Sequence, residues 1–65
     1  MRLCRQKLYL AMARAIMNPN DVARAAEMPR ATMDNAIRGD DVRPATVGKI
    51  AKALGIDPAE LIEED

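Results

Sequence analysis

Residues 30–38, RATMDNAIR, carry side chains that can form paired hydrogen bonds. On a helix, five of them fall opposite the apolar Met33 and Ile37: Arg30, Ala31, Asp34, Asn35 and Arg38. An arginine can bind O6 and N7 of guanine together, an asparagine can pair with N6 and N7 of adenine, and an alanine methyl can touch the thymine methyl. The exposed side of this segment is therefore predicted to fit the major groove of double-stranded DNA.

The same spacing allows a simpler interpretation. Arg30, Asp34 and Arg38 are four residues apart, so they could form a solvated ladder of ion pairs. Such a ladder would contribute only a few tenths of a kcal/mol per pair, roughly 0.2–0.5. The helix alone does not decide between the two interpretations.

Several classes of chemistry need residue types that the chain lacks. There is no His and no Ser, and Cys4 is the one thiol, so serine triads, cysteine–histidine pairs and ordinary zinc sites cannot be assembled. We therefore expect no enzyme, no cofactor and no metal. Asp40 and Asp41 could hold a hard cation, but two solvated loop charges are the better interpretation.

A lone cysteine forms no internal disulfide, which indicates a reducing compartment, and Cys4 is expected to serve as a small hydrophobe. The apolar runs are too short to span a bilayer, and the N-terminus lacks the apolar block of a signal peptide. The sequence thus predicts a cytoplasmic protein with no membrane partner.

Charge is distributed unevenly, although the formal net charge is zero. Residues 1–52 contain all ten Lys and Arg and five acids, whereas residues 53–65 contain five acids and no base. The two regions carry +5 and −5. Such polarity can present a positive face to a polyanion.

The composition and the punctuation of the chain predict one compact all-α domain of 65 residues with five helices. Asn18, Pro19 and Asp21 are typical of a helix start, and Asp57, Pro58 and Glu60 repeat the pattern. Gly39 and Gly55 stand where left-handed caps are expected. The expected helices cover residues 3–17, 19–26, 29–38, 44–54 and 58–63.

A tight corner separates the second and third expected helices. Pro29 disfavours helical geometry at Met28 and suits the start of a new helix, so the chain must turn sharply over Glu27–Pro29. Two helices joined so closely have to cross at small residues, which Ala23 and Ala26 provide. The complete unit of helix, corner and helix favours DNA binding over an ion-pair ladder.

The segments NDVARAAEMPRATMDNAIRG and VRPATVGKIAKALGIDPAELI resemble the helix-turn-helix of the Cro and lambda-repressor-like regulators and the two helices that follow it. The resemblance covers roughly residues 3–63. It implies a dimeric, sequence-specific DNA-binding transcriptional regulator, most simply a repressor, whose recognition helix is Pro29–Arg38.

The resemblance also implies roles for individual residues. The positions that read bases in such proteins match Arg30, Ala31, Asp34 and Asn35. Contacts to the phosphate backbone are implied for Asn18, Asn20, Thr32, Arg38 and Arg43.

Some residues depart from the family pattern. Glu27 stands where the turn commonly has glycine, and Pro19 replaces a glutamine that often binds phosphate. Asp40 and Asp41 would repel phosphates unless they point away, or they would keep non-specific affinity low. Met12 and Ile37 stand in place of a buried ion pair of some relatives, an exchange that is often neutral or stabilising.

The first expected helix has a second apolar stripe, formed by Leu3, Leu10 and Met17. Either the last helix or a second subunit is expected to cover this stripe. The candidates for a homodimer interface are therefore the stripe residues Leu3, Leu10 and Met17, together with Leu61 and Ile62 of the last helix. An exposed stripe would favour an alternative function, an antitoxin-like or anti-repressor module that grips a partner protein. With no sensor domain in 65 residues, we expect regulation through concentration, proteolysis or a separate protein.

Overall fold

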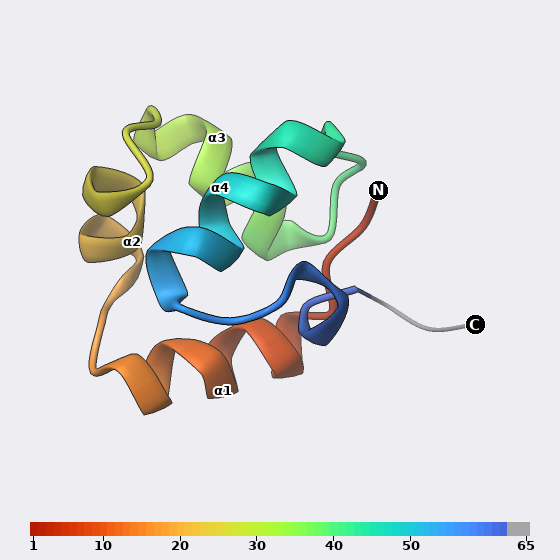
Figure 1. Ribbon diagram of the computed structural model, residues 1–65. Coiled ribbons are helices and arrows are strands. Elements are labelled where there is room, and N and C mark those ends of the chain that lie inside the picture. The colour runs from red at the N-terminus through yellow and green to blue at the C-terminus, as the bar shows by residue number, and fades with distance from the viewer. Residues whose placement is uncertain (63–65) are drawn as a thin grey trace.

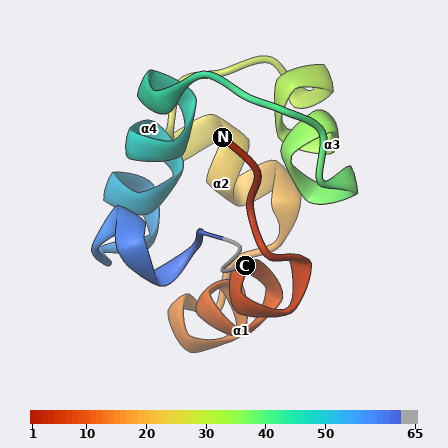
Figure 2. The same ribbon diagram turned by 90° about the vertical axis from the view of Figure 1, so that its right-hand side faces the viewer.

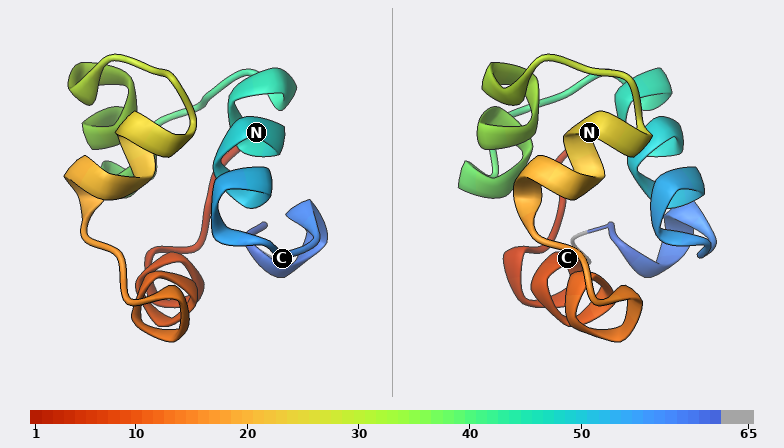
Figure 3. Two further views of the ribbon diagram at one scale, coloured as in Figure 1. Left: turned by 60° about the vertical axis from the view of Figure 1, so that its left-hand side comes forward. Right: turned by 90° about the vertical axis from the view of Figure 1, so that its left-hand side faces the viewer.

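The computed structural model describes residues 1–62, which form a small helical domain around one core (Figure 1). The helices are α1 (Arg5–Ala15), α2 (Pro19–Ala25), α3 (Arg30–Arg38) and α4 (Pro44–Leu54), followed by a 3₁₀ helix, η1 (Pro58–Glu60). When the domain is viewed with α2 in front, α3 lies on one side of α2, α4 lies on the other side, and α1 runs beneath (Figure 3). The all-α prediction is confirmed for the described residues.

The fifth helix differs from the prediction. Residues 58–60 form a single 3₁₀ turn, and Ile62 pairs with Leu3 in an isolated antiparallel bridge; residue 63 of the expected helix lies outside the described part. The capping box of Asp57 and Glu60 is present, so the start signal is correct. The turn ends early because the chain joins the N-terminal segment: the Leu61 carbonyl accepts a hydrogen bond from Cys4 N at 2.8 Å.

The same pairing shortens α1, which was expected over residues 3–17. Leu3 and Cys4 are extended against the C-terminal segment, and the helix stops before Ile16, which adopts a left-handed conformation at φ 55°. The N-terminal segment continues along the side of the domain to the loop between α3 and α4 (Figure 2). There Met1 and Val42 exchange backbone hydrogen bonds of 2.7 Å.

The core is built from aliphatic, alanine and methionine side chains of every α-helix. It contains no buried polar or charged residue within residues 1–62. Its best covered large members are Leu3, Leu8, Val22, Met33, Val47, Ile50 and Leu61. Ala23 and Ala26 are buried where α2 approaches its neighbours, as the tight corner requires.

All four α-helices end in one hydrogen-bonding pattern, in which two successive N–H groups close back onto the last turn. After α3, Gly39 N donates to the Ala36 carbonyl at 3.2 Å and Asp40 N donates to the Asn35 carbonyl at 3.1 Å. The left-handed residue is glycine after α3 and α4, but Ile16 after α1 and Glu27 after α2. The glycine caps are as predicted. At Ile16 and Glu27 the left-handed backbone is strained, because these residues have a Cβ atom.

Candidate nucleic-acid interface

The tight corner at Glu27–Pro29 separates α3 from α2 and sets the direction in which α3 begins. Met28 N donates to the Ala23 carbonyl at 3.0 Å, Glu27 turns the chain at φ 55°, and Pro29 stays extended as the N-cap of α3. Met33 and Ala36 are then buried, while Arg30 and Ala31 are exposed and Asp34 and Asn35 are half-buried. The four predicted base-reading residues therefore lie on an accessible side of α3.

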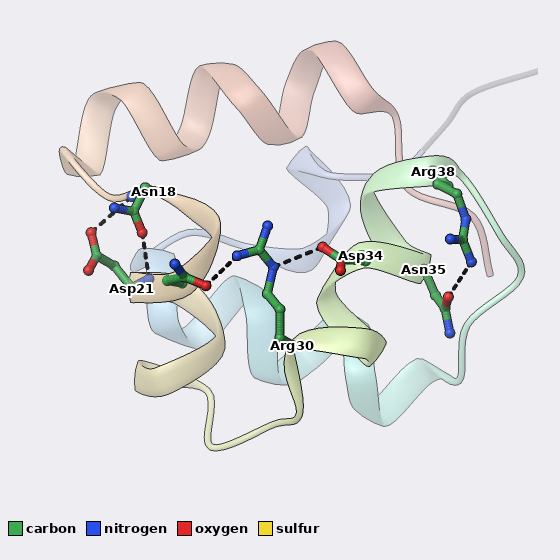
Figure 4. Close-up of polar contacts among 7 residues, drawn as sticks. Asn18, Asp21, Arg30, Asp34, Asn35 and Arg38 are labelled. Carbon is green, nitrogen blue, oxygen red and sulfur yellow. Dashed lines mark hydrogen bonds and ion pairs between the residues drawn. The ribbon is translucent and has the colours of Figure 1, made fainter.

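A polar cluster at the start of α3 joins it to α2. Arg30 Nε donates to Asp34 Oδ1 at 2.8 Å, and Arg30 Nη1 donates to Asn20 Oδ1 (Figure 4). Asn20, predicted to bind phosphate, thus holds the guanidinium of a predicted base-reading residue. Part of the alternative interpretation, the ion-pair ladder, is confirmed, since Arg30 and Asp34 do pair.

A second cluster closes the other end of α3. Arg38 donates from Nε and Nη2 to Asp40 Oδ2 at 3.3 and 2.9 Å. Its Nη2 also donates to Asn35 Oδ1, the bond drawn in Figure 4. The ladder predicted Asp34 as the partner of Arg38, but the observed ion pair is with Asp40. Gly39 turns Asp40 back toward the last turn of α3, which helical spacing could not reveal.

The remaining predicted phosphate contacts are spread over three elements. Asn18 caps α2 by accepting from Asp21 N at 2.8 Å, while Asp21 accepts from Asn18 N at 3.0 Å, which confirms the predicted capping box. Thr32 is half-buried on α3, and Arg43 is exposed as the N-cap of α4. Their phosphate roles stay predictions.

Arg5 was missed by the sequence analysis. It belongs to α1, yet its Nε donates to the Ile37 carbonyl at 3.1 Å, so its positive charge lies at the C-terminal end of α3. A cation is favourable there because the last carbonyl groups of a helix carry partial negative charge. Nothing in the spacing of the sequence pairs residue 5 with residue 37.

Asp41 lies in the loop after α3 and is paired with a cation. The α-amino group of Met1 donates a hydrogen bond to it, and this bond, followed by the charge of the amine, holds the pKa of the Asp41 carboxyl below its ordinary value. Both loop acids therefore have positive partners, Asp40 from α3 and Asp41 from the N-terminus. Within residues 1–62, no group of three or more His, Cys, Asp or Glu is arranged to hold a metal ion.

The dimer candidates separate into covered and open residues. Leu3 and Leu61 are 1% and 0% exposed, because both belong to the core of their own chain, so they leave almost no side-chain surface for the predicted subunit interface. Met17 and Ile62 are half-buried against the core, whereas Leu10 is 52% exposed. Of the expected stripe, Leu10 has the most exposed side chain.

No helix in the described part of the chain is long and apolar enough to cross a membrane.

Comparison with known proteins agrees with this geometry. The family model of the Cro/C1-type HTH DNA-binding domain matches residues 7–64. The restriction-modification controller protein C.AhdI from Aeromonas hydrophila is similar in structure, with a TM-score of 0.76 and 24% identity over 86% of each chain. None of the curated proteins compared with the sequence matches it.

Two larger proteins contain a similar unit. PhpD, solved with cadmium atoms, gives a TM-score of 0.82, and a hydroxyethylphosphonate dioxygenase variant gives 0.83, each at 23% identity. Both likenesses cover 98% of this chain, and the chain spans 14% of the length of each of those proteins. At this identity they show a shared fold and carry no activity over to this chain.

Proposed function

Because the chain belongs to the Cro/C1-type HTH DNA-binding domain family, we propose that it is a sequence-specific transcriptional regulator, most simply a repressor, that inserts α3 into the major groove. The observation that carries the proposal is the accessible side of α3. Arg30 and Asn35 lie on it with guanidinium and amide groups that can bind base edges.

We further propose that the protein acts as a homodimer on a near-palindromic operator. Two recognition helices about 34 Å apart would enter successive major grooves on one side of the duplex. Every charged residue among 53–65 is an acid, and phosphates would repel these acids, so the duplex should approach the basic part of the chain, residues 1–52.

Two substitutions test the proposal. Asn35→Ala should weaken binding to the cognate duplex by roughly 1–3 kcal/mol and relax one base preference, whereas Arg43→Ala should weaken binding to every sequence alike and reduce the salt dependence. Affinities are measured across salt concentrations on a duplex selected by the wild-type protein and on mixed-sequence duplex. Equal losses for both variants on every sequence would remove Asn35 from the base-reading role.

A second candidate is a protein-interaction module of the antitoxin or anti-repressor type. It is favoured by the apolar side chains exposed on and just after α1: Tyr9, Leu10 and Ile16. Retention on mixed-sequence duplex DNA at low salt distinguishes the two functions, because a module that binds only protein should not be retained.

A further inference from the structure

Asp40 occupies an unusual place for an acid near a proposed DNA surface. Its backbone N–H is bonded to the Asn35 carbonyl at 3.1 Å, and its carboxylate takes two hydrogen bonds from Arg38. The left-handed Gly39 between α3 and Asp40 makes this return possible. Backbone and side chain together fix Asp40 against the last turn of α3.

The donors of Arg38 are divided in a definite way. A guanidinium has five N–H groups and no acceptor. Nε–H and one N–H of Nη2 face Asp40, and the other N–H of Nη2 faces Asn35, which leaves the two N–H groups of Nη1 for a phosphate.

This arrangement decides how the Asn35 amide is turned. Because Arg38 can only donate, the oxygen of the amide must face it, and the NH₂ group must then point away. An asparagine that reads adenine has to present NH₂ to N7 while its oxygen accepts from N6. The oxygen has a second lone pair, so the contact with Arg38 fixes the amide without using up its capacity.

We propose that Asp40 is a positioning residue for sequence recognition: it holds Arg38 against Asn35 and thereby fixes the orientation in which Asn35 meets a base. The inference rests on the proposed function. It predicts that an acid beside the DNA surface strengthens base preference, although it weakens attraction to phosphate.

Asp41→Asn is the matched control, since it removes the same charge from the next residue of the same loop. Asp41 is paired with the Met1 amine, and no hydrogen bond or ion pair joins it to an α3 side chain among the described residues. Both variants should bind mixed-sequence duplex as well as or better than wild type, because each removes one negative charge near phosphates.

Base preference separates the two variants. The duplex is one selected by the wild-type protein, compared with the same duplex changed at the base pair whose preference is lost in Asn35→Ala. Asp40→Asn should reduce that preference about fivefold, the lower end of what one bidentate contact provides, while Asp41→Asn should leave it within about twofold of wild type. Arg38→Lys, which keeps the charge but cannot bridge Asp40 and Asn35 with a planar fork, should resemble Asp40→Asn.

The free protein gives a second measurement that needs no DNA. The ¹⁵N–¹H signals of the Asn35 side-chain amide should shift in Asp40→Asn and stay in place in Asp41→Asn, with unchanged melting curves showing that both variants are folded. Unchanged Asn35 signals in Asp40→Asn, or the same base preference in both variants, would overturn the inference. If the wild-type protein bound no duplex, the proposed function would fail and the inference with it; selective wild-type binding with identical Asp40→Asn and Asp41→Asn profiles would remove the inference alone.

Discussion

Helices α3 and α1 bury their inner sides in the same way but expose different chemistry. Each contributes a stripe of apolar side chains to the core, including Met33 from α3 and Leu8 from α1. The outer side of α3 carries charged and amide groups joined by hydrogen bonds. The outer side of α1 carries Tyr9 and Leu10, and the helix contains no acid.

The difference shows which part of the sequence can report on function. Buried stripes are required by any fold of this kind, because aliphatic burial stabilises it. Exposed residues contribute little to stability, so their types are free to serve binding. The linked polar groups of α3 suit a polar, charged partner, whereas α1 exposes Tyr9 and Leu10 on the same helix as Arg14, which suits a partner with both apolar and acidic groups.

The largest effect is expected from breaking the buried side of α3. Met33 is fully buried, so Met33→Ala should lower the free energy of unfolding by about 2–5 kcal/mol through lost contacts and a cavity. Met33→Leu, which nearly conserves volume, should cost less than about 1.5 kcal/mol. Urea unfolding measures both values, and equal small losses would show that α3 does not depend on this core.

The next largest effect is expected on DNA affinity, when one exposed arginine of α3 and one of α1 are each replaced. If Arg30 reads a base as proposed, Arg30→Ala should weaken binding to the selected duplex by about 1–3 kcal/mol, because that contact and a charge are lost together. Arg14→Ala removes the same charge from exposed α1 and should have a much smaller effect. Equal losses in binding titrations would mean that net charge, and not the face of α3, governs affinity.

The ends of the two helices provide a smaller contrast in stability. Ile16→Gly should raise the free energy of unfolding by up to about 1 kcal/mol, because glycine relieves the left-handed strain after α1 at some cost in chain entropy. Gly39→Ala should lower it by about 1 kcal/mol, since a side chain there meets no atom within 4 Å but must adopt φ 86°.

Thermal or urea denaturation of these two variants measures the contrast. Changes of the same sign would contradict the assignment of strain to Ile16. Glu27→Gly, at the corner before α3, should behave like Ile16→Gly.

The smallest effect is expected on the outer side of α1. Leu10→Ser should change stability by less than about 0.5 kcal/mol, because the side chain is half-exposed. Its affinity for DNA should stay within about twofold of wild type if α1 does not face the duplex. Sedimentation of the same variant reports whether this side joins two subunits, and a large loss of DNA affinity with an unchanged oligomer would place α1 at the DNA.

Local signals predicted most of the fold. Asn18 and Asp21 form the expected capping box, Gly39 and Gly55 are left-handed caps, and Pro29 marks the corner before α3. The ends of α1 and the fifth helix were wrong, because Leu3 and Ile62 pair across the whole chain. No propensity or period reports such a long-range contact.

For the candidate site, the sequence predicted which side chains of α3 point outward, but it did not predict the hydrogen bonds that these side chains form. The apolar stripe of α3 indicated which side chains point outward, since helical periodicity fixes direction. The bonds from Arg30 to Asn20 and from Arg38 to Asp40 join different elements, so they depend on the corner and on Gly39. Leu3 and Leu61 were candidates for a subunit interface because the sequence does not show that each is buried in the core of its own chain.

An NMR titration with a short duplex selected by the protein shows which helix contacts DNA. If the outer side of α3 contacts DNA, the largest changes in backbone amide signals should fall on Arg30–Arg38 and on the N-terminal turn of α2. The amides of α1 from Tyr9 to Ala13 should change little. Changes centred on α1 with α3 unperturbed would exclude α3 as the helix that binds DNA.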